Sequence, residues 1–407
     1  MIEIRTNIKK NVIEYTMSKK LRYMKNQRFV ISYTFDLKSF PLHLANFMVG
    51  ILLSEHISWT GEDVLFSSLT KKEVKCINKH ILNNFIANPY KRVINKCPEV
   101  HSKNISKSEL NFDGGPVITM NGMGKDGLAL ASLVRELNIE LVSCVVANQY
   151  KNMSLWKDRA RAMKKFYSSK GIIPAWVGTS YFRGNSYKII PWQVFAFPVA
   201  WFYSSRDILI GFNLGDSKFY LGNGYSPRPN VTVFSFDAIS KATGFRIGNP
   251  FWGVSHLVIQ RLILERYPEV AQFQRSCMRG IPWCGRCGKC LGINILARAG
   301  GNTTKKLSLR NMRIHCDTSH WRRANPLSAD VYMEAEKKLR GEEYQLWIEK
   351  LNLNAQKFAW HPTKVMKILK EHVSCTKVDP GKNGLGYTNV PSIWSNICLK
   401  DKWSINV

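Results

Sequence analysis

The hydrophobic and polar positions in the central part of the chain predict a strand, a glycine-rich turn, a helix and a second strand. Residues 116–120 (PVITM) form a short apolar run, and residues 128–137 (LALASLVREL) place apolar positions at helical spacing. Residues 139–147 (IELVSCVVA) are a second buried run. A strand–helix–strand unit predicts a parallel sheet with a right-handed crossover. We therefore expect an α/β fold with a Rossmann-like parallel sheet.

The same reading of periodicity predicts the remaining elements. Strands are expected at 29–37, 207–212 and 232–236, and helices at 42–57, 71–86, 156–167, 191–203, 250–267, 291–299, 329–351 and 363–372. Residues 1–27 are expected to be a surface arm, 91–108 a basic connector and 222–230 a mobile loop. We predict an N-terminal α+β accessory domain (1–110), an α/β core (111–300) and a basic, mostly helical C-terminal extension (301–407).

Composition is that of a folded globular protein. The chain has 407 residues, of which 45% are hydrophobic. No apolar segment follows the early lysines as in a signal peptide, and the longest apolar run, 44–53, is far short of the roughly 20 residues that span a bilayer. The sequence therefore predicts an intracellular, cytoplasmic protein without a membrane partner.

The net charge of +30 is unusually high. A basic protein of this kind often binds a polyanion such as nucleic acid or a phosphate-rich substrate. The abundance of lysine, asparagine and isoleucine also fits compositional drift in an AT-rich genome, although drift does not explain the shortage of acidic residues. Both explanations of the charge stay open at this point.

Four of the ten cysteines lie in one short segment, as Cys277 and then Cys284, Cys287 and Cys290 in a CxxCxxC spacing. Four thiolates can close a tetrahedral zinc site, which leaves no position for water, so the metal would be structural. An iron–sulfur cluster and a chance grouping of buried cysteines are the alternatives. His315, Cys316 and His320 have no fourth partner nearby and are expected to be structural.

The turn between the first predicted strand and helix, Gly122 to Gly127 (GMGKDG), has the features of an anion site. Backbone N–H groups and the helix dipole favour phosphate at such a position. Lys125 adds a positive charge, and Asp126 could hold Mg²⁺ through water or cap the helix. Asn213 and Asp216 follow the strand predicted at 207–212, where open α/β sheets bind ligands. The alternative is an ordinary helix-capping turn.

The turn and the cysteine segment together resemble the PP-loop ATP pyrophosphatases, a family with a Rossmann-like (HUP-type) sheet and an SGGxDS loop. Gly124, Lys125 and Asp126 match the SGGKDS version of that loop, whereas both serines and the first glycine are replaced. The 7-cyano-7-deazaguanine synthases of this family carry a similar S-C, C-x-x-C-x-x-C zinc site. The epimerases that act on UDP-MurNAc-L-Ala-L-Glu carry a segment similar to residues 276–290, SCMR followed by WCGRCGKC.

The resemblance implies an enzyme that uses ATP and Mg²⁺ to adenylate a carbonyl or carboxylate substrate, with release of pyrophosphate. Modified-nucleobase chemistry of the 7-deazaguanine kind is one such reaction that the resemblance suggests. By this resemblance Gly122, Gly124, Lys125 and Gly127 contact phosphate and Asp126 contacts the metal; Lys125 and Asp126 would be the catalytic pair. Asn213 and Asp216 would face the same crevice, and Zn²⁺ would be held by the four cysteines. Two alternatives remain: the epimerase reaction, and an inactive zinc-stabilised protein that binds nucleotide or nucleic acid.

Overall fold

The computed structural model describes residues 1–275 with gaps, and residue 368. The gaps are 23, 87–95, 108–109, 111, 113, 149–152, 182–190, 212–217, 221–224, 230, 252–258 and 261. Residues 276–367 and 369–407 lie outside the described part, and with them the helices predicted at 291–299, 329–351 and 363–372, apart from Ile368.

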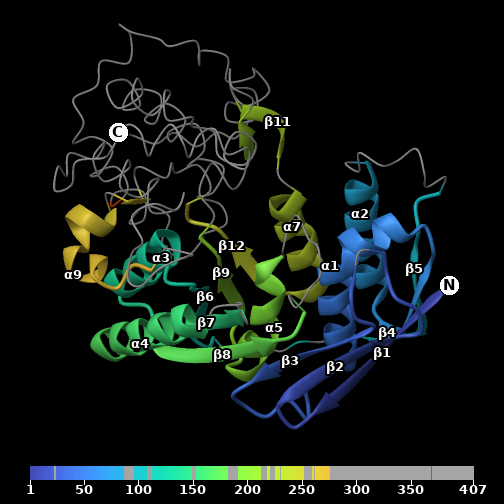
Figure 1. Ribbon diagram of the computed structural model, residues 1–407, viewed down its shortest axis with the longest axis horizontal. Helices are drawn as coiled ribbons and strands as arrows, with labels where there is room; N and C mark the ends of the chain where they lie inside the picture. The colour runs from blue at the N-terminus through green and yellow to red at the C-terminus, as the bar shows by residue number, and fades with distance from the viewer. Residues whose placement is uncertain are drawn as a thin grey trace, which may run out of the picture.

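A ten-stranded sheet runs through the whole described chain, in the order β12-β9-β6-β7-β8-β3-β2-β1-β4-β5 (Figure 1). Its strands are β1 (Ile2–Lys9), β2 (Val12–Met17), β3 (Arg28–Tyr33), β4 (Val64–Leu69), β5 (Val100–Ile105), β6 (Val117–Met120), β7 (Leu141–Asn148), β8 (Ile173–Thr179), β9 (Asp207–Leu209) and β12 (Arg246–Gly248). A separate hairpin is formed by β10 (Lys218–Tyr220) and β11 (Tyr225–Pro229).

The central sheet is mostly parallel, so the expected α/β class is confirmed. Within the group β8-β7-β6-β9-β12 every pairing is parallel, and β1-β4-β5 form a second parallel group. Antiparallel pairings join the two groups through β3 and β2. In chain order the first group reads 3-2-1-4-5, which is compatible with a Rossmann-like, doubly wound sheet.

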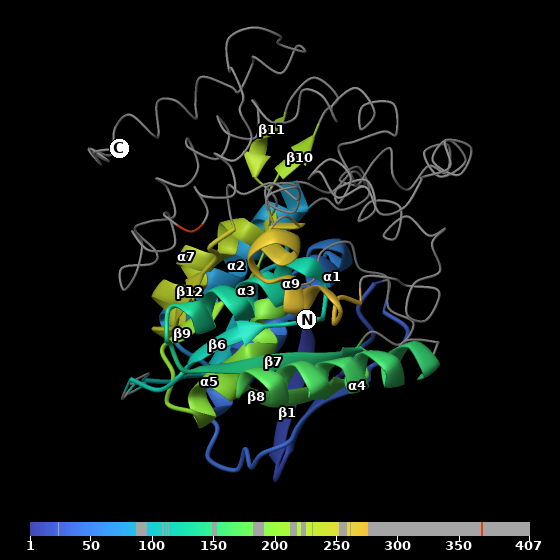
Figure 2. The same ribbon diagram turned by 90° about the vertical axis from the view of Figure 1, so that its left-hand side faces the viewer.

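Helices cover both faces of this sheet (Figures 1 and 2). They are α1 (Leu42–Thr60), α2 (Lys71–Ile86), α3 (Lys125–Glu136), α4 (Met153–Lys170), the short η2 (Trp192–Ala196), α5 (Phe197–Phe202), α7 (Val231–Thr243), the π-helical turn η3 (Leu262–Arg266) and α9 (Pro268–Ala271). One core cluster holds buried residues of α1, α2, α5 and α7, and the other holds those of α3, α4, η3 and α9.

Successive side chains of a strand point to opposite faces of the sheet, so one strand contributes to both cores. In β6, Val117 belongs to the α3–α4 core and Ile118 to the α1–α7 core, and in β7 Leu141 and Val142 divide in the same way. A parallel strand that is buried on both faces reads as a continuous apolar run, which is why β6 and β7 are recognisable in the sequence.

Four sequence-based expectations are wrong. The connector expected at 91–108 contains strand β5, which pairs with β4 in the central sheet. Residues 1–27 are not a surface arm, because they form β1 and β2, which bury alternate side chains such as Ile2, Ile4 and Tyr15. The strand expected at 232–236 is the first part of helix α7, and the loop expected at 222–230 contains strand β11. The domain boundary expected near residue 110 stays a prediction; the sheet itself continues across it.

Among the described residues, no helix combines the length and the apolar character that a membrane crossing requires.

Candidate functional site

The glycine turn lies where the winding of the parallel sheet reverses. Strand β6 pairs with β7 on one side and with β9 on the other, and both pairings are parallel. The chain crosses from β6 to β7 through α3, on one face, and reaches β9 only after η2 and α5, on the other face. Open α/β sheets bind their ligands at the carboxyl edge of such a switch point.

The chain that leaves β9 is packed directly against the first turn of α3. A Cβ atom added to Gly211 would lie 3.1 Å from the backbone carbonyl oxygen of Asp126. Only glycine allows two backbones to approach this closely. Gly211, the last residue described before the gap that follows β9, therefore lies beside the first turn of α3.

Asn121, the first residue after β6, organises the turn. Its backbone N–H donates to the carbonyl oxygen of Cys144 at 3.1 Å, and its Oδ1 accepts the N–H of Met123 at 2.9 Å. An asparagine that bonds the backbone two residues on forms an Asx turn. Met123 has a φ of +60°, a left-handed conformation that non-glycine residues rarely adopt, and its side chain is fully buried.

The side-chain amide of Asn121 is a buried donor without a partner. Asn121 is 3% exposed, and its Nδ2 makes no hydrogen bond in the described part of the chain. Leaving such a group unsatisfied costs about 1–3 kcal/mol, so buried amides almost always have an acceptor. The side chain lies against the first turn of α3, because a Cβ added to Gly127 would come within 2.6 Å of Asn121 Oδ1.

The N-terminus of α3 is open to a ligand. The helix begins at Lys125, and its N-cap, Gly124, makes no side-chain capping bond. A Cβ added to Gly122 or Gly124 would meet none of the described atoms within 4 Å, so space lies over both glycines. The first-turn amides of a helix have no partner within the helix, and the helix dipole favours an anion there. The geometry therefore fits a phosphate group.

Lys125 and Asp126 are brought together, although different contacts were expected for them. Lys125 Nζ donates to both carboxylate oxygens of Asp126, at 2.7 and 2.8 Å. The lysine is 5% exposed, whereas the side chain of Asp126 keeps 25% exposure. Each charge is balanced by the other in this structure, and a phosphate or a metal ion would compete with that pairing.

Arg275 joins the turn to helix α4 and was not recognised from the sequence. Its backbone N–H donates to the carbonyl oxygen of Met123 at 2.8 Å, and its Nε donates to Asp158 Oδ2 at 3.0 Å. The residue before it, Gln274, exchanges two amide hydrogen bonds with Gln260 at 3.1 and 3.2 Å. The chain is thus held beside the glycine turn directly before the cysteine segment begins.

Several predicted site residues lie outside the described part of the chain. These are the proposed metal ligands Cys277, Cys284, Cys287 and Cys290, together with Asn213, Asp216, His315, Cys316 and His320. Among the described residues no group of three or more His, Cys, Asp or Glu side chains could hold a metal ion.

Comparison with known proteins gives one match. A family model described as "Family of unknown function (DUF6395)" matches residues 235–381, which include the later part of α7, all of β12 and the cysteine segment. No curated protein and no solved structure matches the chain.

Proposed function

We propose that this protein binds ATP at the Gly122–Gly127 turn and transfers its adenylyl group to a carbonyl or carboxylate oxygen of a second substrate, in the manner of the PP-loop ATP pyrophosphatases. The observation that carries the proposal is the buried amide of Asn121, which has no hydrogen-bond partner among the described residues, at an open helix N-terminus on the switch point of the sheet. The strand order of the parallel group supports the same family of folds, including its HUP-type sheet.

The reaction needs little covalent chemistry from the protein. The substrate oxygen attacks the α-phosphorus of ATP, and the bond from that phosphorus to the bridging oxygen breaks. Pyrophosphate leaves with the bond electrons, and the product is an adenylate whose AMP group is readily displaced. Binding and charge stabilisation at the phosphates therefore supply most of the catalysis.

The chain's own residues have separate tasks in this scheme. The amides of Gly122, Gly124 and Gly127 lie at the turn that would hold the phosphates, and Asn121 Nδ2 would donate to an oxygen that reaches it. Lys125 would leave Asp126 to contact a phosphate, which frees the carboxylate for Mg²⁺. The ion would supply positive charge to the departing pyrophosphate. Asn213 and Asp216 would approach from the end of β9.

We further propose that Cys277, Cys284, Cys287 and Cys290 hold a structural Zn²⁺. Four thiolates satisfy the metal fully. Arg275, the last described residue before this segment, is bonded to the glycine turn. Purified protein is expected to contain about one zinc per chain, and Cys287→Ser should lower that content. Iron in place of zinc would contradict this assignment.

The Lys125–Asp126 pair favours a second candidate, a protein that binds nucleotide without turning it over. A lysine that is 5% exposed and bonded to both oxygens of its neighbour must be released before it can contact phosphate. Breaking a charged pair in a site that is only partly open to water costs free energy, so this geometry is also compatible with binding alone.

The test separates these outcomes by measuring ATP·Mg²⁺ binding and pyrophosphate release on the same variants. Asn121→Asp keeps an acceptor for the Met123 N–H but removes the unpartnered donor, so we expect the Kd for ATP to rise tenfold or more. Asn138→Asp, the same change at an exposed position at the far end of α3, should leave binding unaltered.

Two results would overturn the proposal. Equal ATP affinity in the Asn121→Asp and Asn138→Asp variants would show that the nucleotide does not occupy the turn. Pyrophosphate release that survives Asp126→Ala would remove the catalytic role of the pair. ATP binding without release of pyrophosphate, across carbonyl and carboxylate substrates, would establish the second candidate instead.

A further inference from the structure

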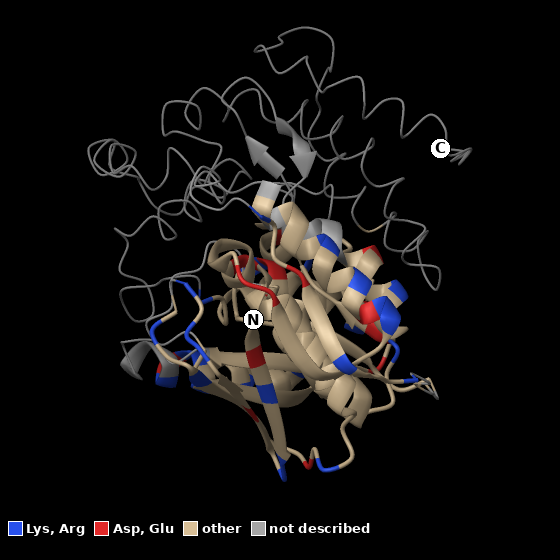
Figure 3. Cartoon of the chain, turned by 90° about the vertical axis from the view of Figure 1, so that its right-hand side faces the viewer, with Lys and Arg blue, Asp and Glu red and all other residues tan. Residues whose placement is uncertain are grey.

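Residues 18–28 (SKKLRYMKNQR), which are the connection between β2 and β3 together with the first residue of β3, form a basic surface segment. It contains five cationic side chains and no acidic residue, namely Lys19, Lys20, Arg22, Lys25 and Arg28. All five are exposed. Figure 3 shows the blue positions of lysine and arginine along this connection. We refer to residues 18–28 as the basic loop.

The basic loop has a fixed shape. Leu21 and Met24 are 0% and 3% exposed, so they anchor the loop in the core. The loop is closed by a bond from the N–H of Met17 to the carbonyl oxygen of Gln27 at 2.9 Å. A preorganised loop of this kind gives up little conformational entropy when it binds a ligand.

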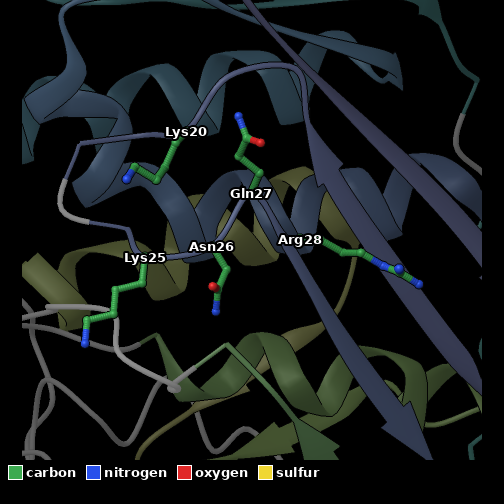
Figure 4. Close-up of a pocket in the computed structure, with 5 residues that line it drawn as sticks. All are labelled: Lys20, Lys25, Asn26, Gln27 and Arg28. Carbon is green, nitrogen blue, oxygen red and sulfur yellow. The ribbon is translucent and has the colours of Figure 1, made fainter.

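The outer side of the basic loop forms an open hollow of about 580 Å³ lined by Lys20, Lys25, Asn26, Gln27 and Arg28 (Figure 4). The ends of Lys20 and Lys25 point to the same side of the loop, whereas Arg28 points away from them and pairs with Glu14. Because their ends share one side, Lys20 and Lys25 present two positive charges to an anion, next to two amide side chains.

The sheet places the basic loop on the same edge as the glycine turn. Strand β3 is antiparallel to β8, and β8 is parallel to β7 and β6. The start of β3 and the carboxyl ends of β6, β7 and β8 consequently lie at one edge. Met120 and Arg28 are separated by three strand spacings across the sheet and by seven residues along the strands. This corresponds to a distance of roughly 25 Å.

We propose that the basic loop is a docking site for the phosphate backbone of a single-stranded nucleic acid. A small phosphate compound cannot touch both the loop and the glycine turn, whereas a strand of several nucleotides spans that separation. Lysines supply the salt-dependent attraction to phosphates, and exposed asparagine and glutamine amides bond to bases or sugars. In this proposal, part of the chain's net charge of +30 serves to bind nucleic acid and does not result from compositional drift.

The bound nucleic acid could present one of its bases to the glycine turn. This step rests on the proposed function, whereas binding of the nucleic acid at the basic loop does not. In that case the substrate is a nucleobase carbonyl within the strand. Its oxygen would attack the α-phosphorus of ATP as in the reaction above, with pyrophosphate as the leaving group.

The experiment measures fluorescence anisotropy of labelled 20-nucleotide RNA and DNA strands of mixed sequence over a range of salt concentrations. Each phosphate contact in a single strand contributes about 0.7 to the slope of log K against log salt, so Lys20→Ala/Lys25→Ala should lower the slope by about 1.4. The matched control is Lys71→Ala/Lys72→Ala. These lysines are also exposed, but they lie at the start of α2, at the opposite edge of the sheet.

A fall in slope for the Lys20/Lys25 variant alone supports the docking site. Equal slopes for the two variants, or no strand binding by the unchanged protein at low salt, would overturn it. Competition by inorganic phosphate would also overturn the docking site. If phosphate displaces the nucleic acid at the concentration at which phosphate binds by itself, the hollow is a small-anion site. Strand binding without any pyrophosphate release would contradict the proposed reaction and leave the docking site intact.

Discussion

The backbone N–H of Arg275 donates to the carbonyl oxygen of Met123 across 2.8 Å, and this bond connects two segments that are far apart in the sequence. Met123 is the left-handed residue of the glycine turn, and Arg275 is the last described residue before the cysteine segment. The shape of the turn therefore depends on a distant part of the chain.

Arg275→Leu should destabilise the protein by about 1–3 kcal/mol, because it leaves the largely buried carboxylate of Asp158 without its charged partner. The control is Lys170→Leu, which breaks the ion pair with Glu269. The Glu269 side chain is 51% exposed against 16% for Asp158, so water can solvate the carboxylate that is left and the control should cost less than about 1 kcal/mol. Urea unfolding of both variants measures the difference, and equal losses would contradict it.

Met123→Gly introduces the glycine that the PP-loop pattern has at this position. The substitution should affect the stability of the fold in two opposite ways. Glycine relieves a left-handed conformation that costs about 1–2 kcal/mol. The lost side chain is fully buried, and truncation of a buried methionine costs about 2–5 kcal/mol. We expect the loss of packing to dominate, so the variant should unfold at a lower urea concentration. A rise in the unfolding midpoint would show that relief of backbone strain outweighs the lost packing.

Gly127→Ala should disturb the turn, whereas Gly124→Ala should not. The new Cβ at Gly127 would lie 2.6 Å from Asn121 Oδ1 and 3.0 Å from Asn121 Cα, so the strand end must move. Overpacking of this kind costs about 1–3 kcal/mol. No described atom comes within 4 Å of a Cβ at Gly124. Thermal unfolding of the two variants without nucleotide is the measurement, and a smaller loss at Gly127 than at Gly124 would refute the packing account.

Acid should weaken the fold through His80. Burial, and then the neighbouring charge of Lys79, lowers the pKa of His80 from 6.5 to about 4. Between these two values the unfolded chain binds the proton more readily, so stability falls as the pH decreases from 6.5 toward 4. The loss by pH 5 is about 2 kcal/mol, at 1.36 kcal/mol for each pH unit.

His80→Leu removes that titration. The difference in unfolding free energy between pH 7.5 and pH 5 should shrink by about 2 kcal/mol relative to the unchanged protein. Burial lowers the pKa of His56 in the same direction, so part of the acid sensitivity should remain. An unchanged difference between the two pH values in the His80→Leu variant would contradict this assignment.

The central βαβ unit could be predicted from the sequence because its signals are local and agree with one another. The apolar run of β6, the glycine turn and the amphipathic α3 follow directly along the chain, and the amphipathic helix predicted at 71–86 has the same bounds in the structure. The prediction of a strand at 232–236 is wrong. It relied on the local preference of Val, Thr and Phe for strands. Packing of Phe236 and Ile239 in the α1–α7 core overrides that local preference.

The most informative parts of the site could not be found in this way. That the Asn121 amide has no acceptor among the described residues is visible only in the folded structure, because no sequence pattern reports which acceptors lie near a side chain. Asparagine followed by glycine at a strand end does signal a turn. The contact of Arg275 with Met123 requires the whole α/β core to form first, since nothing near either residue in the sequence indicates the other.

The antiparallel pairing of β3 with β8 removes what would otherwise be an exposed sheet edge. Ile31, Ser32 and Tyr33 pair with Thr179, Gly178 and Val177, and this ladder covers the outer side of the parallel group. A chain that began at residue 111 would present β8 as a bare edge strand, with unpaired N–H and C=O groups ready to capture another copy. The N-terminal strands therefore act as a built-in guard against edge-to-edge aggregation of the half that carries the glycine turn.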